Sequence, residues 1–351
     1  MTLLIVTNIT AFLITLFLTL VIKKVAFKYN ICAKPNNRSI HQKRIPLLGG
    51  IAIFGAFLLS FSIIWIFAGP SLAHLIREIF VFLLGGFLIL LVGIYDDIKG
   101  AYWFEKFAVQ FLAGSIVVLF GYKISVIVSP FGGSIALGVF SVPITLLWIV
   151  FITNALNLID GLDGLAAGIS FIAACLMLFI SLWFGNIASA FPAAILAGSL
   201  LAFLIFNFNP AKIFLGDSGS LFLGFMLACF SINGTFRDST GVAMLIPIIV
   251  LGIPITDTIL AFIRRLRKGV HPFVADKEHI HHKLLTLGMT HKQAVLSINF
   301  VSLLWGSIAV VILISKSPYS MFLLFMIFAT ILWGIKKMGF VQYFLIQNKS
   351  D

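Results

Sequence analysis

The chain has 351 residues, of which 61% are hydrophobic and 10% are charged, and its formal net charge is +12 at pH 7. Soluble domains average about half apolar and about a quarter charged residues, so the composition excludes an ordinary soluble domain and a disordered chain. It also excludes a nucleic-acid-binding protein, because the 24 Lys and Arg residues are scattered between long apolar runs instead of forming one basic face. The composition predicts an all-α polytopic membrane protein.

Apolar runs separated by polar breaks predict about eleven membrane-spanning helices, since each span needs about 20 apolar residues. Their expected bounds are 2–22, 47–68, 79–95, 104–121, 142–159, 164–184, 190–208, 219–233, 241–263, 294–315 and 319–335. The first run is followed by Lys23 and Lys24, which is the reverse of a cleavable signal peptide, so we expect it to be retained. We expect residues 1–351 to form a single membrane-embedded domain.

Lys and Arg residues gather in alternate loops, which predicts the orientation of the chain. The loops 23–46, 96–106, 209–218 and 264–293, with the tail after residue 335, hold 20 of the 24 basic residues. Because cytoplasmic loops are enriched in Lys and Arg, we expect the N-terminus outside and the C-terminus in the cytoplasm.

Acidic residues concentrate on the same predicted face. Ten of the twelve lie there, namely Asp96, Asp97, Glu105, Asp160, Asp163, Asp217, Asp257, Asp276, Glu278 and Asp351. Acids contribute little to orientation, and unpaired charges at the edges of spans are costly. We therefore expect the loops near 23–46, 96–106, 160–164, 209–218 and 264–293 to form an active-site face.

The first cytoplasmic loop is basic and includes Arg38 and His41 before Pro46, Gly49 and Gly50. Taken alone, this pattern indicates attraction to anionic lipids. It is also suited to hold the phosphate head of a lipid substrate.

Two adjacent carboxylates, Asp96 and Asp97, end the third predicted span. In an apolar setting they would repel each other unless one holds a proton or a cation lies between them. Mg²⁺ accepts one or two carboxylates together with phosphate oxygens. A solvated helix end is the alternative interpretation.

Polar residues recur every third position at the end of the fifth span, as Asn154, Asn157, Asp160 and Asp163. Residues three apart are neighbours on a helix surface. Gly161 and Gly164 predict a helix break here, and the N-terminus of the next helix would suit a phosphate. The alternative is a short capped turn.

The segment 206–221 contains Asn209, Phe214 and Asp217 at the entry to the eighth span. Asp217 follows Gly216 and precedes Gly219, and glycines permit close backbone approach. Ser218 or Ser220 is expected to cap the helix. Asp217 itself would then be either a cap or a ligand, and Phe214 either a core residue or a base-stacking residue.

The long loop 264–283 begins with Arg264 and Arg265 and ends with His279, His281 and His282. Arg binds phosphate through its forked donors, although these arginines also serve as topology signals. His donates to phosphate, shuttles protons or binds metal. No Cys accompanies the histidines, so with carboxylates nearby magnesium or manganese fits better than zinc.

Together these motifs, over about residues 34–290, resemble the polyprenyl-phosphate N-acetylhexosamine-1-phosphate transferases, which are glycosyltransferases of family 4. The form His279-Ile-His-His282 resembles the branch that uses an N-acetylglucosamine donor. The branch that transfers the muramoyl-pentapeptide precursor usually has three consecutive histidines. Leu47 departs from the first branch, which often has Arg at that position.

The resemblance implies transfer of N-acetylhexosamine 1-phosphate, first of all the N-acetylglucosamine form, from a UDP-sugar to undecaprenyl phosphate. The products would be an undecaprenyl-diphospho-sugar and UMP, made at the cytoplasmic face of the bacterial inner membrane to begin a cell-envelope polysaccharide or teichoic acid. The alternatives are phospho-MurNAc-pentapeptide transfer and, in another class, secondary transport. Transporters often show repeated halves with sites at the midplane, which this sequence lacks. The donor sugar, the downstream polymer and a homodimer remain open.

The resemblance also implies roles for residues. The catalytic residues would be Asp96, Asp97, Asp160 and Asp217, with Asp217, Asp96 and Asp97 as ligands of Mg²⁺ or Mn²⁺. The substrates would be bound by Asn154, Asn157, Asp163, Asn209, Phe214, Arg264, Arg265, His279, His281, His282, Arg38 and His41. A one-step attack and a route through an aspartyl intermediate both remain open.

Overall fold

The computed structural model describes residues 1–33, 44–67, 73–128, 134–233, 245–269 and 279–315, with isolated residues between 319 and 330. Arg38 and His41 lie outside the described residues, and so does most of the predicted span 319–335.

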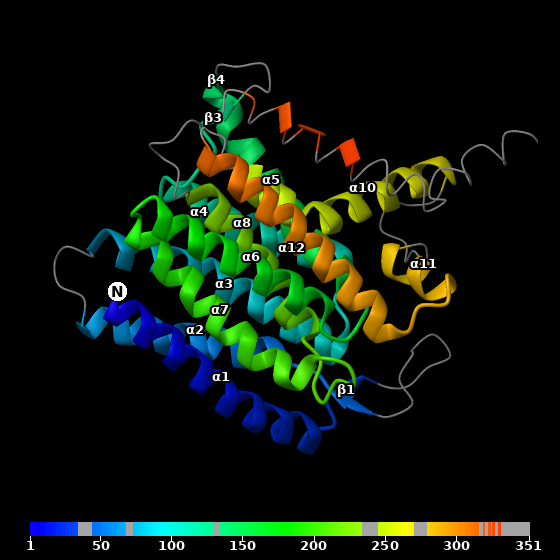
Figure 1. Ribbon diagram of the computed structural model, residues 1–351. Helices are drawn as coiled ribbons and strands as arrows, with labels where there is room; N and C mark the ends of the chain where they lie inside the picture. The colour runs from blue at the N-terminus through cyan, green and yellow to red at the C-terminus, as the bar shows by residue number, and fades with distance from the viewer. Residues whose placement is uncertain are drawn as a thin grey trace, which may run out of the picture.

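Long apolar helices run side by side through the molecule (Figure 1). They are α1 (Thr2–Lys28), α2 (Gly49–Phe67), α3 (Ala73–Lys99), α4 (Trp103–Leu119), α5 (Ser141–Ile159), α6 (Leu165–Trp183), α7 (Ile187–Asn207), α8 (Gly216–Asn233) and α12 (His291–Ser315). The shorter helices are α9 (Leu245–Val250), α10 (Gly252–Arg267), α11 (Ile280–Thr286) and the 3-10 helix η2 (Gly138–Phe140).

Among the described helices, seven are long and apolar enough to cross a membrane by length and composition, and α8 is a shorter apolar helix. The chain is therefore an all-α, multi-pass membrane protein. The count of about eleven spans and the orientation of the termini stay predictions.

The predicted span 241–263 is not one continuous helix over its described residues, 245–263. The structure divides them at Leu251 into α9 and α10, and α10 continues to Arg267. Pro254 explains the break, because its ring would clash with the carbonyl four residues earlier and it has no N–H to donate. Figure 1 shows α10 leading away from the parallel helices.

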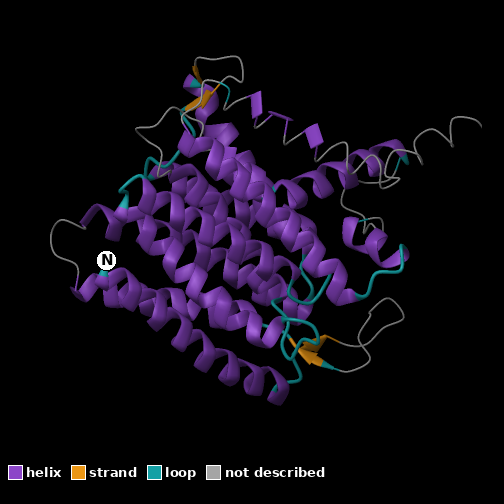
Figure 2. Ribbon diagram, viewed as in Figure 1, coloured by secondary structure: helices purple, strands orange, loops and turns teal. Residues whose placement is uncertain are grey.

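Two small antiparallel hairpins lie at opposite ends of the helices (Figure 2). Strand β1 (Cys32–Ala33) pairs with β2 (Ile45–Pro46), and β3 (Val126–Val128) pairs with β4 (Ser134–Ala136). The second pair lies between α4 and α5. The N-terminus lies toward the β3–β4 end, and β1 and α11 lie toward the other end (Figure 1).

Helix α8 is the centre of the apolar core. It packs against α2, α3 and α5, and its side chains from Leu221 to Cys229 are buried on all sides. Gly85 and Gly86 of α3 face Phe225 and Phe222 closely enough that neither position has room for a Cβ. A helix that is apolar all round is buried in this way, and the N-terminus of α8 is thereby held among the ends of its neighbours.

Candidate active site

The N-terminus of α8 meets the C-terminus of α3 and the start of α4, and three charged side chains converge there. Lys106 Nζ lies 3.1 Å from Asp96 Oδ2 and 2.8 Å from Asp217 Oδ2. Asp96 and Asp217 are far apart in sequence but share one ammonium group. All three side chains keep partial access to solvent, between 18% and 26% of their surface. We name Asp96, Asp97, Lys106 and Asp217 the carboxylate–lysine cluster.

Asp97 has a different arrangement from its neighbour Asp96. Its Oδ1 accepts the backbone N–H of Asp217 at 2.8 Å, and its Oδ2 accepts that of Ser218 at 3.1 Å. The carboxylate thus satisfies the free N–H groups at the start of α8 and complements the helix dipole. The expected cap by Ser218 or Ser220 is wrong, because α3 supplies it and Ser220 instead donates to the Gly216 carbonyl at 3.0 Å.

Glycines allow the close approach of these helices. Gly216 has φ +72° and a Cβ there would meet the Asp97 carboxylate. Gly50 of α2 and Gly93 of α3 lie against the backbone of Ser218 and Gly219 with no room for a Cβ. The first turn of α8 is therefore clamped between two other helices.

The polar residues of the α5–α6 turn divide among different neighbours. Asn154 donates to Gln110 Oε1 of α4 at 2.6 Å, and Asn157 donates to Ser220 Oγ of α8 at 2.9 Å. Asp160 follows the last turn of α5. Burial raises the pKa of Asp160 well above its usual range, and the negative charges of Asp217, Asp97 and Asp163 raise it further. The cluster of carboxylates thus extends to this turn.

Asp163 is buried and joins its turn to the loop after α7. Its Oδ2 accepts from Asn209 Nδ2 and from the backbone N–H of Ala211, each at 3.0 Å. The backbone N–H of Asp163 donates to His291 Nε2 at 2.8 Å. His291 Nε2 is therefore unprotonated. The predicted binding residues Asp163 and Asn209 are brought together by this contact.

The loop after α7 is also attached to the start of α2. Phe214 N–H donates to the Pro46 carbonyl at 2.8 Å, and the Phe214 carbonyl accepts from Gly49 N–H at 3.0 Å. Its side chain is partly buried. Stacking of Phe214 on a base stays a prediction.

The histidines at the start of α11 form a compact group. His279 and His281 have parallel rings 5.7 Å apart, and His281 and His282 lie 4.3 Å apart between ring centroids. His281 packs on Gly161 of the acidic turn, where a Cβ would collide with its Nε2. Burial lowers the pKa of His281 to about 3, so its ring is neutral at ordinary pH. His279 Nδ1 lies 2.7 Å from Asp257 Oδ2.

Arg264 and Arg265 lie in the last turn of α10 and are both buried. They share with Asp257 and Ala261 the buried face of α10. Their binding to phosphate stays a prediction.

The donors of the carboxylate–lysine cluster suit a hard divalent cation. In the described parts of the chain, no three His, Cys, Asp or Glu side chains form a group that would hold a metal ion. Asp96 and Asp217 nevertheless converge on one point, and the oxygen donors of their carboxylates suit magnesium or manganese. Three carboxylates against one ammonium leave net negative charge, which a divalent cation would balance. Asp97 retains lone pairs beyond its two backbone donors.

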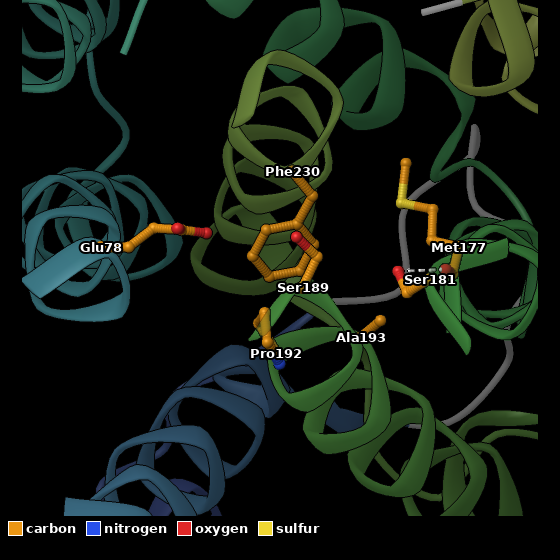
Figure 3. A pocket seen from close by; sticks show the side chains of 7 residues that line it. All are labelled: Glu78, Met177, Ser181, Ser189, Pro192, Ala193 and Phe230. Carbon is orange, nitrogen blue, oxygen red and sulfur yellow. Dashed lines mark hydrogen bonds between the residues drawn. The ribbon is translucent and has the colours of Figure 1, made fainter. Parts of the chain in front are cut away.

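A small cavity lies near the other end of α3. Figure 3 shows Glu78 entering from one side, with Phe230 and Ser189 between it and Met177 and Ser181. Ser181 donates to the Met177 carbonyl at 2.7 Å. Glu78 is separated from Asp96 by roughly 27 Å along α3 at 1.5 Å per residue. The cavity is therefore remote from the predicted site.

Four residues that sequence reasoning did not select contact the predicted site, namely Lys106, Gln110, Asp257 and His291. Lys106 counted only as a topology residue, although it follows Asp96 by ten positions. Asp257 offered a signal, because a carboxylate inside an apolar run is costly unless it is paired. Gln110 offered a weaker signal of the same kind.

The chain is similar to known proteins over most of its length. The family model described as glycosyl transferase family 4 matches residues 79–235. A Bacillus subtilis (strain 168) protein named "Probable undecaprenyl-phosphate N-acetylglucosaminyl 1-phosphate transferase" is 36% identical over 92% of this chain and 88% of its own length.

Other relatives carry related names. A Mycolicibacterium smegmatis decaprenyl-phosphate N-acetylglucosaminephosphotransferase is 37% identical over 83% of this chain and 77% of its own. An undecaprenyl-phosphate alpha-N-acetylglucosaminyl 1-phosphate transferase of Escherichia coli (strain K12) is 29% identical over 86% of this chain and 82% of its own. The similarity therefore covers most of the chain as well as its motifs.

Proposed function

The chain belongs to glycosyl transferase family 4, and on that premise we propose that it transfers N-acetylglucosamine 1-phosphate from UDP-N-acetylglucosamine to undecaprenyl phosphate. The products are undecaprenyl-diphospho-N-acetylglucosamine and UMP. The reaction begins a cell-envelope polysaccharide or a teichoic acid. The names of the relatives favour this reaction over muramoyl-pentapeptide transfer and over transport.

In the one-step form of the reaction, the chemistry is a single displacement at phosphorus. An oxygen of the lipid phosphate forms a bond to the β-phosphorus of the donor, and the bond from that phosphorus to the bridging oxygen breaks. UMP leaves with the electron pair. Catalysis of such transfers depends mainly on positioning and on neutralising charge.

The meeting of substrates explains why the site lies at one end of the helices. The lipid phosphate lies at the membrane surface, whereas the nucleotide sugar arrives from water. We place this end on the cytoplasmic side, since the basic loops gather there. This puts the N-terminus outside and the C-terminus in the cytoplasm.

The observation that carries the proposal is the convergence of Asp96 and Asp217 on Lys106. Asp217 and Asp96, with Asp97 beside them, would hold Mg²⁺, which when bound neutralises charge on the donor diphosphate. Lys106 supplies a further positive charge at the same point. Asp97 holds Asp217 in place through the backbone of α8. Asp160, on the turn beside the cluster, would contact the nucleotide sugar.

Donor recognition would come from the polar residues around the cluster. The α5–α6 turn and the following loop bring Asn157, Asp163 and Asn209 to this end, with Phe214 for the uracil. Arg264, Arg265 and the histidines of α11 would bind the diphosphate or the sugar. Arg38 and His41 would grip the lipid phosphate.

Release of UMP by the purified full-length protein tests the proposal. We expect UMP from UDP-N-acetylglucosamine only when undecaprenyl phosphate and Mg²⁺ are both present, with EDTA stopping the reaction. A panel of other UDP-N-acetylhexosamines gives the donor preference. No UMP from any donor, or uptake of the donor into vesicles without UMP, contradicts the proposal.

A further inference from the structure

We propose that Asp257 is a positioning residue that orients His279 for the transfer reaction, a proposal that rests on the proposed function. The pair joins α10 to α11 across 22 positions of sequence. Asp257 Oδ2 lies 2.7 Å from His279 Nδ1. Both side chains are almost completely buried, with 1% and 7% of their surface exposed.

Both carboxylate oxygens of Asp257 are used. Oδ1 accepts the backbone N–H of Ile280 at 2.9 Å, while Oδ2 contacts the histidine ring. One side chain therefore holds the backbone at the start of α11 and the ring of His279 at the same time. The ring can neither rotate nor shift along α11 without breaking one of these contacts.

The pairing determines the tautomer of His279. An ionised carboxylate only accepts hydrogen bonds, so Nδ1 must carry the proton. In the neutral ring Nε2 is then the unprotonated nitrogen, and it faces away from Asp257. The pair thus presents Nε2 as a hydrogen-bond acceptor.

Ring stacking connects the pair to the predicted site. His279 stacks parallel to His281, and His281 packs on Gly161 between Asp160 and Asp163. His279 is therefore one ring away from the acidic turn of the active site. A carboxylate confined to holding α11 would need only its Oδ1 contact with Ile280.

The variant Asp257→Asn separates orientation from capping. The amide oxygen still accepts from Ile280 N–H, but the NH₂ group donates to His279 Nδ1 and forces the proton to Nε2. We expect kcat to fall on the order of 10- to 100-fold, by analogy with the partners that orient metal-ligating histidines. The KM for UDP-N-acetylglucosamine and the thermal midpoint should stay near those of the wild type.

The matched control is Thr256→Val. Thr256 is the preceding buried residue of α10, and its hydroxyl donates only to the Gly252 carbonyl of the same helix at 2.6 Å. Its loss removes a buried hydroxyl without touching the histidine. We expect wild-type turnover from this control.

A double-mutant cycle and a tautomer measurement complete the experiment. His279→Gln should lose at least as much activity as Asp257→Asn, and the double variant should lose no more than His279→Gln alone. In ¹⁵N NMR of histidine-labelled protein at mildly alkaline pH, His279 should show protonated Nδ1 in the wild type and protonated Nε2 in Asp257→Asn.

The outcomes separate the two proposals. Wild-type protein that releases no UMP contradicts the proposed function, while the NMR measurement still tests the Asp257–His279 pair. Wild-type turnover in Asp257→Asn, an unchanged tautomer, or losses that multiply in the double variant would each overturn the positioning role. Full activity in His279→Gln beside a loss in Asp257→Asn would also overturn the positioning role, because Asp257 would then not act through His279.

Discussion

The carboxylate–lysine cluster at α8 and the Asp257–His279 pair at α11 contain the same kinds of chemical group but differ in their exposure to solvent. Each combines an aspartate, a basic side chain and the N-terminus of a helix. In the cluster, the side chains of Asp96, Lys106 and Asp217 keep about a fifth of their surface exposed. In the pair, Asp257 is sealed from solvent.

This difference in exposure suits the two groups of charges to different tasks. Lys106 contacts two carboxylates at a surface that solvent reaches, so its place can be shared with a cation or a phosphate. Asp257 has no such access, and an unpaired carboxylate there would be costly. An accessible cluster can exchange partners during a reaction, whereas a sealed pair can only hold its partner. The predictions below test this distinction.

The largest effect is expected for Asp217→Asn. The change removes one charge from the accessible cluster but keeps the backbone N–H that Asp97 accepts, so the fold should persist. Transfer should fall about 10²- to 10³-fold, as when one preorganised electrostatic group is lost. UMP release measures the loss of transfer, and the thermal midpoint measures whether the fold persists. Near-normal turnover would contradict the assignment of the cluster as the catalytic site.

Lys106→Met should reduce turnover somewhat less, because the carboxylates of Asp96 and Asp217 remain but repel the phosphates of both substrates. The same change should tighten Mg²⁺ binding on the order of tenfold, since the competing ammonium is gone. Titration of Mg²⁺ against UMP release measures both quantities. Weaker Mg²⁺ binding would show that Lys106 supports the cation site instead of competing for it.

Asp97→Ala tests the part of the cluster that holds structure. Loss of this cap from α8 should lower stability by about 1 to 2 kcal/mol, which a thermal or denaturant unfolding curve would report. Lys99→Ala is the matched control, because Lys99 is an exposed residue of the same last turn of α3. Equal stability of the two variants would contradict the capping role.

A change of one pH unit in the acid range is the mildest perturbation, and it acts on the buried ring of His281. His281 has a pKa near 3 in the fold instead of its usual value near 6.5. Burial is the main cause, the neighbouring His282, His279 and His291 lower the pKa further, and Asp257 raises it. The unfolded chain therefore binds a proton that the folded chain does not.

His281 does not lower the free energy of unfolding above about pH 6.5. As the pH falls from there toward the pKa of the folded state, the free energy of unfolding decreases by at most about 1.4 kcal/mol per pH unit. Unfolding curves at several pH values, with His281→Gln as the comparison, measure this slope. The variant should show a shallower decline below pH 6.5. Identical slopes would mean that the ring is accessible to protons in the fold.

Sequence and structure agree where the signal is local. The apolar runs behind α1 to α8 and α12 specify helices by length and composition, and Gly161 and Gly164 mark the turn between α5 and α6. The span predicted at 241–263 is divided because Pro254 interrupts a helix. A run of apolar residues does not show this effect, since Pro254 is only one residue within it.

The sequence predicted most of the acidic residues of the site but not which side chains contact one another. Asp96, Asp97 and Asp217 were identified as polar residues at span edges, whereas Lys106 and Asp257 were not assigned to the site. Lys106 acquires its place from Asp217, which lies 111 positions away. No local pattern carries such information.

By itself, the sequence determined the membrane class, most helices and the end of the molecule where charge gathers. These follow from the burial of apolar surface, which depends on composition and on the spacing of apolar residues along the chain. Only the tertiary structure decided which aspartate shares an ammonium, which caps a helix and which holds a histidine. Hydrogen bonds and ion pairs act over about 3 Å, so their partners are set by how the helices pack.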